Sequence, residues 1–109
     1  MADLLGTFEQ AVLLTILRLG DEAYGRAILS DVHEVLRRSV SAGSVYTTLD
    51  RLEARGLVNS RLAEGTPGRG GRARRYYMVA AKGVGDLNDA RTTLTAMWAS
   101  VQLPTGVRP

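Results

Sequence analysis

Residues 41–58 read SAGSVYTTLDRLEARGLV, and they contain a short helix together with its start and stop signals. A serine at 41 or at 44 can cap this helix, because its oxygen accepts hydrogen bonds from the free N–H groups of the first turn. The apolar side chains that follow recur at the spacing of one helix face, at Val45, Leu49 and Leu52. Gly56 suits the left-handed position just beyond a helix end. The pattern predicts a helix over residues 45–55.

A hairpin is expected directly after this helix. Residues 57–62 and 73–79 alternate loosely between apolar and polar side chains, as strands do. The segment between them, residues 65–72, reads GTPGRGGR and contains no core-forming side chain. Glycine and proline in such a run mark turns and loops. We therefore expect two strands joined by a long, flexible, basic tip.

Two helices are predicted before residue 41. Residues 5–19 form the first, because apolar side chains recur at helical spacing and Gly20 stops the pattern. Three leucines widen its apolar stripe, at Leu13, Leu14 and Leu17. A helix with so wide a stripe is expected to be largely buried. The second helix opens at Tyr24-Gly25, and its apolar positions are Tyr24, Ile28, Val32 and Val35 or Leu36.

A fourth helix is predicted over residues 82–102. Its apolar side chains step by three and four residues, which is the spacing of a helix-pairing seam: Leu87, Ala90, Leu94, Met97 and Val101. Trp98 lies beside this seam. Residues 104–109 begin with a proline that cannot continue the helix, and we expect them to form a disordered tail.

Composition limits the class of protein. The chain has 109 residues, 45% of them hydrophobic, which fits one globular domain. It contains no cysteine, which excludes disulfides and thiolate metal sites. The first residues carry no basic stretch typical of a secretory signal, and no apolar run approaches the roughly 18 residues of a membrane span. We therefore expect a cytoplasmic protein that does not bind a membrane.

Positive charge is concentrated in one third of the chain. Residues 51–82 hold seven arginines and one lysine against two glutamates, a formal balance of +6. Residues 1–50 balance to −3 and residues 83–109 to zero. A scattered set of charges usually forms only a solvated face, but a cluster of arginines suits phosphates and guanine edges. The distribution favours a nucleic-acid partner.

The order helix–helix–helix–hairpin–helix is that of a winged helix-turn-helix. The expected fold class is mainly α with a small β-hairpin, followed by a C-terminal dimerisation helix. We assign residues 1–80 to a winged helix-turn-helix DNA-binding domain, residues 81–103 to the dimerisation helix and residues 104–109 to the tail.

The residue inventory argues against an enzyme. His33 is the only histidine, so no second histidine or cysteine can join it as a ligand or base. The glycine run 65–72 resembles a phosphate-binding loop, but Gly71-Arg72 stands where Lys followed by Ser or Thr is required, and a strand follows instead of a helix. We expect no catalytic residue, no metal and no cofactor.

Four pieces of the sequence together resemble the PadR family of transcriptional regulators. They are, in chain order, Tyr24-Gly25, residues 41–53 (SAGSVYTTLDRLE), Gly56-Leu57-Val58 and residues 70–77 (GGRARRYY). Each piece is weak alone, but the combination in this order is specific. The resemblance covers about residues 4–101 and implies a repressor dimer of the short subgroup, with a single helix after the wing. One departure is Ala80-Ala81-Lys82-Gly83, where the family often has a Thr-Pro-Glu-Gly-like helix start.

The helix over residues 45–55 is the expected recognition helix, which enters the major groove and presents its first side chains to base edges. Its candidates for contact with DNA are Ser44, Tyr46, Thr47 and Arg51. The resemblance implies that Tyr46 contacts DNA, and the alternative is a half-buried ring packed beside Leu49. Arg51 can equally pair with a neighbouring carboxylate.

The wing supplies four further candidates for contact with DNA, namely Arg69, Arg72, Arg74 and Tyr76. Arg69 and Arg72 flank two glycines, where the backbone can approach a phosphate or enter a minor groove. Arg74 and Arg75 point to opposite faces of a strand. We favour Arg74 as the one that faces DNA, because it shares its face with Arg72 and Tyr76.

The seam predicts a dimer interface formed by six residues: Leu87, Ala90, Leu94, Met97, Trp98 and Val101. The alternative is packing on the helix over residues 5–19 of the same chain. A dimer is favoured because a two-fold pair reads two half-sites about 34 Å apart, whereas a lone winged helix contacts few bases. Some members of the family it resembles bind flat aromatic compounds near this interface, so the resemblance implies a similar site here. Trp98 is thus the candidate for stacking on a small aromatic effector, although a tryptophan in a helix interface is more often core.

The sequence as a whole predicts a regulator that binds double-stranded DNA sequence-specifically, as a homodimeric repressor on a pseudo-palindromic operator. The alternative is a winged-helix protein-interaction module in which the basic wing only aids solubility. RNA binding ranks third, because no pair of stacking aromatic side chains typical of single-strand platforms stands out.

Overall fold

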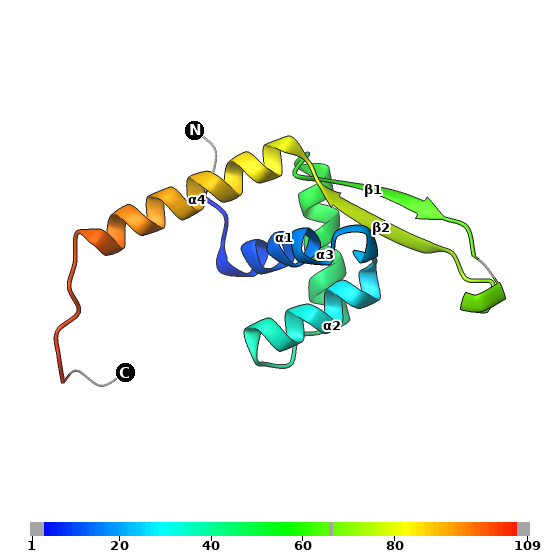
Figure 1. Ribbon diagram of the computed structural model, residues 1–109, viewed down its shortest axis with the longest axis horizontal. Coiled ribbons are helices and arrows are strands. Elements are labelled where there is room, and N and C mark those ends of the chain that lie inside the picture. The colour runs from blue at the N-terminus through cyan, green and yellow to red at the C-terminus, as the bar shows by residue number, and fades with distance from the viewer. Residues whose placement is uncertain (1–3, 66, 107–109) are drawn as a thin grey trace.

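The computed structural model describes residues 4–65 and 67–106, except for the side chain of Arg69. The main elements are, in order, α1 (Thr7–Leu19), α2 (Gly25–Leu36), α3 (Ala42–Ala54), β1 (Val58–Ala63), β2 (Arg74–Val79) and α4 (Ala81–Ala99). Short 3-10 turns follow α1 (Gly20–Glu22) and occupy the hairpin tip (Pro67–Arg69). The architecture is mainly helical with one small hairpin (Figure 1), so the predicted fold class is confirmed.

The core lies where α1, α2 and α3 meet the base of the hairpin. Its fully buried side chains include those at the predicted positions of α2 and α3: Ile28, Val32, Val45, Leu49 and Leu52. Burial of each such side chain contributes about 1.5–3 kcal/mol to folding. The apolar period read from residues 41–58 therefore marks the face of α3 that packs inward, which leaves its other face for a partner.

Helix α1 differs from its prediction in two respects. It begins at Thr7 and not at Leu5, because the Gly6 N–H donates to Glu9 Oε1 at 3.0 Å and caps the first turn. Its buried side chains run along one face only, so Leu14 and Leu17 are 47% and 49% exposed. The expectation that these leucines are buried is wrong, because α4 does not close over this side of α1.

Helix α3 begins three residues earlier than predicted, at Ala42. Ser41 is the capping serine: its Oγ accepts from the Ser44 N–H at 3.0 Å and its hydroxyl donates to Ser44 Oγ at 2.8 Å. The helix ends at Ala54, and Gly56 has a φ of +77°, which confirms the left-handed stop.

The hairpin pairs β1 and β2 in an antiparallel register that sets Arg61 opposite Tyr76 and Ala63 opposite Arg74. Each strand begins one residue later than predicted. A single bridge joins Tyr24 to Tyr76, and the Tyr77 N–H donates to the Ala23 carbonyl at 2.8 Å. The turn between α1 and α2 therefore acts as a minimal third strand that holds the base of the hairpin.

Helix α4 is anchored at its amino end. Gly83 lies so close to the Leu57 carbonyl oxygen that a Cβ at this position would approach it to 2.3 Å. The Ala80 N–H donates to the same carbonyl at 2.9 Å, and Lys82 Nζ donates to the Arg55 carbonyl at 3.0 Å. These contacts fix the direction in which α4 leaves the body.

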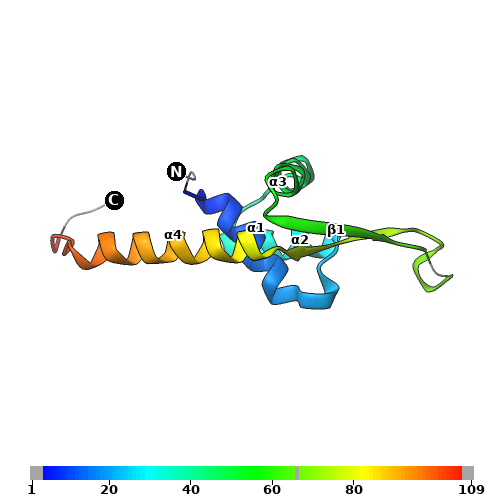
Figure 2. The ribbon, with the colours of Figure 1, turned by 90° about the horizontal axis from the view of Figure 1, so that it is seen from above.

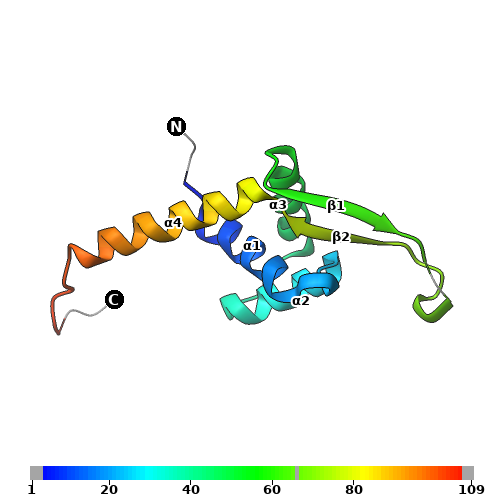
Figure 3. The ribbon, with the colours of Figure 1, turned by 45° about the horizontal axis from the view of Figure 1, so that its top comes forward.

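The far end of α4 projects from the molecule on the side opposite to the hairpin tip (Figures 1 and 3). The extents are 57 × 32 × 20 Å and the radius of gyration is 16.5 Å, against about 13 Å for a compact domain of this length. The helix ends at Ala99 and not at residue 102, so Val101 lies beyond it. Within the described ranges, no helix is long and apolar enough to cross a membrane.

Candidate nucleic-acid interface

The outer face of α3 presents the side chains that the sequence singled out. Ser44, Thr47 and Arg51 are exposed, and Tyr46 is 40% exposed, while the opposite face of the helix is buried in the core. Ser44 also takes part in the cap with Ser41. All four predicted residues of α3 are thus accessible, but Ser44, Thr47 and Arg51 line a groove on one side of the helix, whereas Tyr46 lines a cleft on the other.

The Tyr46 ring packs on the start of α2. A Cβ on Gly25 would lie 2.6 Å from Cε1 of the Tyr46 ring and 3.1 Å from its hydroxyl. Only a residue without a side chain leaves room for the ring at this point. The Tyr-Gly pair at residues 24–25 therefore has a physical reason: it lets the α3 tyrosine lie across the amino end of α2.

A cleft borders α3 on the side of the hairpin. It measures about 370 Å³ and is walled by the start of α2, by Tyr46 and by the strand β2 with the residues before it. Its cationic side chains are Arg26, Arg72, Arg74 and Arg75. Among the described residues that line it, none carries a carboxylate. We call this space the arginine cleft.

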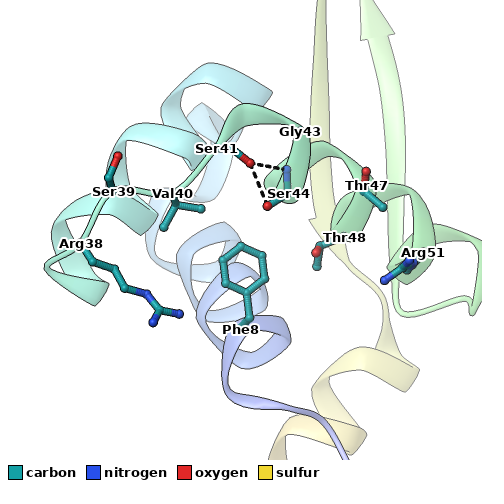
Figure 4. Close-up of a pocket in the computed structure, with 10 residues that line it drawn as sticks. All are labelled: Phe8, Arg38, Ser39, Val40, Ser41, Gly43, Ser44, Thr47, Thr48 and Arg51. Carbon is teal, nitrogen blue, oxygen red and sulfur yellow. Dashed lines mark hydrogen bonds between the residues drawn. The ribbon is translucent and has the colours of Figure 1, made fainter.

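A second, wider groove of about 750 Å³ borders α3 on the other side (Figure 4). Thr47, Thr48 and Arg51 line it from α3, and Phe8 of α1 and Arg38, which follows α2, lie across from them. The groove combines hydroxyl groups with two guanidinium groups. Helix α3 is therefore flanked on both sides by basic, hydrogen-bonding surface.

One face of the hairpin carries a stacked series of arginine and tyrosine side chains. The Arg74 guanidinium lies 4.0 Å from the centre of the Tyr24 ring, and the Arg61 guanidinium lies 4.9 Å from that of Tyr76. The Tyr24 and Tyr76 rings meet edge to face at 5.7 Å between centres. Contacts of this kind contribute about 0.5–1.5 kcal/mol each, so the stack holds the hairpin against the start of α2.

The predicted wing residues differ in how far their side chains are exposed. Arg72 is exposed, Arg74 and Tyr76 are half-buried in the stack, and the side chain of Arg69 lies outside the described residues. Sequence reasoning missed Arg61, because its place in the stack depends on the strand register, which sets it opposite Tyr76.

The other face of the hairpin looks toward α3, and Arg75 lies on it. Figure 2 shows α3 on one side of the strands and the turn after α1 on the other. Arg75 Nη1 donates to Ser60 Oγ at 3.0 Å, and the Ser60 hydroxyl donates to Glu53 Oε2 of α3 at 2.6 Å. These two hydrogen bonds connect β2 to α3 through Ser60 of β1.

Tyr77 lies on the same face of the hairpin and is only 8% exposed. Burial raises the pKa of its hydroxyl above the ordinary value of 10.0, and the carboxylates of Asp50 and Glu53 reinforce the shift while Arg75 opposes it. Tyr77 therefore stays protonated at neutral pH.

The carboxyl half of α4 is apolar and largely uncovered. Ala90 is buried and Leu87 is half-buried, but Leu94, Met97, Trp98 and Val101 are between 49% and 60% exposed. A groove of about 650 Å³ runs between this helix and α1. Its apolar walls come from Leu14, Leu17, Val84, Leu87, Leu94 and Trp98. Leu14 and Leu17 were not predicted as part of this surface.

His33 has a local structural role. Its Nδ1 accepts a hydrogen bond from the Val40 N–H at 3.2 Å, across the turn that leads from α2 to α3. The side chain is half-buried and lines neither the arginine cleft nor the groove of Figure 4.

Comparison with known proteins gives a consistent result. The sequence profile described as "Transcriptional regulator PadR-like family" matches residues 13–89. A PadR-like transcription factor from Bacteroides fragilis shares 26% identity with a TM-score of 0.70, covering 87% of this chain and 86% of that one. A PadR-like transcriptional regulator from Bacillus cereus shares 24% identity with a TM-score of 0.70, covering 87% of each chain.

A further similar structure is that of the Aeropyrum pernix ORC1 protein in complex with DNA. Its identity is 22% and its TM-score 0.64, with 89% of this chain but only 26% of that chain covered, so it shows the fold alone. No curated protein matches the chain.

Proposed function

The chain belongs to the family of PadR-like transcriptional regulators, and we propose that it binds double-stranded DNA sequence-specifically as a homodimeric repressor. The observation that carries the proposal is the exposed side of α3, where Ser44, Thr47 and Arg51 line the groove of Figure 4 and Tyr46 lines the arginine cleft. A helix in the major groove, which is about 12 Å wide, has one phosphate backbone on each side. Basic surface on both sides of α3 meets that requirement.

The wing extends this surface beyond α3. Arg72 is exposed two residues before β2, and the two glycines before it have φ values of +67° and +76°. A backbone without side chains at these positions comes close to a phosphate or a minor groove. In the proposed complex, Arg72 and Arg74 contact phosphates beside the groove that α3 reads. Arg69 belongs to the same proposed set.

In the proposed complex, a second copy of the chain binds the second half-site of the operator. Exposed apolar side chains on a projecting helix, including Met97 at 60% and Trp98 at 57%, are what a two-fold interface would cover. The groove between α1 and α4 gives that partner helix an apolar seat. A two-fold dimer reads a pseudo-palindromic operator with half-sites about 34 Å apart.

Beside the partner helix, we propose the exposed Trp98 ring as the place for a small aromatic effector. Trp98 lines the groove between α1 and α4, and a flat ligand stacks favourably on an indole ring. Because Trp98 is the only tryptophan, its fluorescence reports binding there without a label. A panel of aromatic acids that leaves the emission of the dimer unchanged at millimolar concentration would remove this part of the proposal.

The test of the function is binding to the duplex upstream of the protein's own gene at several salt concentrations. Each phosphate contact contributes about 0.9 to the slope of log affinity against log salt. Arg72→Ala and Arg74→Ala should each weaken binding and lower the slope by about that amount. Arg18→Ala removes an equal charge on α1, at a residue that lines neither the arginine cleft, the groove of Figure 4 nor the groove between α1 and α4, and it should leave the slope unchanged.

Two results would contradict parts of this proposal. A folded, dimeric protein that binds no duplex at low salt contradicts the proposal and favours the protein-interaction module. Unchanged slopes for both wing variants would contradict the wing assignment alone.

A further inference from the structure

His33 supports the turn between α2 and α3 with a side-chain hydrogen bond. Its Nδ1 accepts from the Val40 N–H at 3.2 Å. Both residues are half-buried, so a Val40 N–H that lost this acceptor would cost free energy. A ring nitrogen of histidine accepts a hydrogen bond only when it carries no proton. The bond therefore requires the neutral form of His33.

The turn that this bond closes contains a strained residue. Arg37 ends α2 in the left-handed conformation, with φ +53° and ψ +38°, and within the described ranges it is the one residue other than glycine with a positive φ. This conformation is unfavourable for a residue with a side chain, so the surrounding contacts must hold it. The Arg37 N–H donates to the Glu34 carbonyl at 3.3 Å, and the bond from Val40 to His33 holds the other end of the turn.

The turn leads directly into α3. Val40 precedes Ser41, whose Oγ caps the helix by accepting from the Ser44 N–H at 3.0 Å. The Val40 side chain packs against the core and lines the groove of Figure 4 together with Ser44 and Thr47. A shift of the Val40 backbone therefore moves the first turn of α3, which carries side chains proposed to contact DNA.

His33 is the side chain of this region whose charge changes near neutral pH. The charged side chains of α2, of the turn and of the elements packed against α2 are Arg26, Asp31, Glu34, Arg37, Arg38, Glu9 and Arg18 of α1, Asp50, Arg51 and Glu53 of α3, and Arg74 and Arg75 of β2. Among them, Arg18 pairs with Asp31, and Glu9 pairs with Arg55. Side chains of these types ordinarily keep one charge between pH 5 and 8, whereas histidine changes its charge there. Because His33 is the only histidine and the chain has no cysteine, a change in side-chain charge over this range is assigned to His33.

We propose that His33 is a positioning residue for α3: its neutral imidazole holds Val40, and its protonation releases the turn and weakens binding to the duplex. The inference rests on the proposed binding of duplex DNA and adds to it a dependence on pH. The sign of this dependence separates positioning from a plain charge effect. An added positive charge by itself strengthens attraction to DNA as the pH falls, whereas loss of the bond to Val40 weakens binding.

The experiment measures affinity for the duplex upstream of the protein's own gene at about pH 5.5 and about pH 7.5, at constant salt. The wild type should bind about fivefold more weakly at the lower pH, which is the effect of one hydrogen bond. His33→Asn places an oxygen at the same number of bonds from Cα as Nδ1, and this oxygen accepts a hydrogen bond at either pH. The variant should bind like the wild type at the higher pH and keep that affinity at the lower one.

Two further variants complete the comparison. His33→Leu has no acceptor and should bind about fivefold more weakly than the wild type at the higher pH, with no further loss at the lower one. Glu34→Gln is the matched control, because it changes an exposed charge next to His33 and should keep the pH profile of the wild type. Circular dichroism at both pH values shows whether each protein is folded. If His33→Leu fails to fold, the Val40 amide signal in NMR still decides, since it should move with pH in the wild type and not in His33→Asn.

Three results would overturn the inference while leaving the proposed function intact. They are a wild-type affinity that stays constant or rises toward the lower pH, a decline that His33→Asn shares, and a decline that accompanies loss of the helical circular-dichroism signal. Absence of duplex binding by the folded wild type at either pH would instead contradict the proposed function on which the inference rests.

Discussion

Two projections leave the body of this protein in opposite directions, and their surfaces differ in kind (Figure 1). The hairpin tip is built from glycines and arginines, whereas the end of α4 carries Leu94, Met97 and Trp98 with about half of each side chain exposed. Among the described residues, neither the hairpin tip nor the carboxyl end of α4 contributes a side chain to the core. The first has the chemistry to meet a polyanion, and the second has the chemistry to meet another apolar surface.

The contrast also explains how each projection is attached. Hydrogen bonds and ring contacts hold the hairpin, through Tyr24, Tyr76 and the chain from Arg75 to Glu53. Close backbone packing holds α4, through Gly83 on the Leu57 carbonyl. The hairpin and α4 are therefore both attached to the body of the protein by short, specific contacts.

The largest expected effect comes from placing a charge on the apolar projection. Met97→Glu should weaken the dimer by about a hundredfold, because a two-fold interface contains the substitution twice and each buried charge lacks a partner. Sedimentation velocity at several concentrations measures this. Leu62→Glu is the matched control: Leu62 is 62% exposed, close to the 60% of Met97, but lies on the hairpin. Equal dissociation of the two variants would contradict the distinction between the projections.

Substitutions of two glycines in α4 test how this helix is attached to the body. Gly83→Ala should lower the free energy of unfolding by about 1–3 kcal/mol, because its Cβ would overlap the backbone at Leu57. Gly85→Ala meets nothing within 4 Å and should raise it by up to about 1 kcal/mol through helix propensity. Urea unfolding measures both. Similar effects of the two variants would show that α4 is not held by this contact.

A smaller effect is expected at the start of α2. Gly25→Ala should displace the Tyr46 ring and reduce affinity for the duplex severalfold, since a misplaced side chain loses about one hydrogen bond. The fold should survive, because the ring rather than the backbone gives way. Gel shifts with unchanged affinity, in a variant whose Tyr46 has moved by NMR, would remove Tyr46 from the interface.

The smallest effect concerns alkaline pH. The pKa of Tyr77 is raised by burial, so the folded state keeps its proton where the unfolded chain loses it. Its contribution to stability is therefore complete below pH 10 and declines as the pH rises through the folded pKa, by at most about 1.4 kcal/mol per pH unit. Tyr77→Phe should show a shallower decline in urea midpoints above pH 10. Parallel curves would mean that the hydroxyl is not buried.

Local patterns predicted most of the fold. The positions of Val45, Leu49 and Leu52, the capping serine and Gly56 follow from spacing within one segment, and the structure confirms them. The family resemblance is confirmed as well. Boundaries differed by a few residues where caps decide them, as at Gly6 and Ser41.

Contacts between distant segments could not be predicted from one sequence. The positions of Arg61, Tyr24 and Tyr77 depend on the strand register and on how the hairpin meets α2. The exposure of Leu14 and Leu17 depends on the angle at which α4 leaves the body. Their apolar character is plain in the sequence, but the period alone does not distinguish a side chain that packs in the core from one that stays exposed.

Hydroxyl-radical footprinting on the region upstream of the protein's own gene tests the central claim most directly. The account predicts two protected patches related by a dyad, with their centres about 34 Å apart along the duplex, and loss of both in Met97→Glu at concentrations where the wild type is bound. A single protected patch that survives in Met97→Glu, or no protection by a folded dimer at low salt, would contradict it.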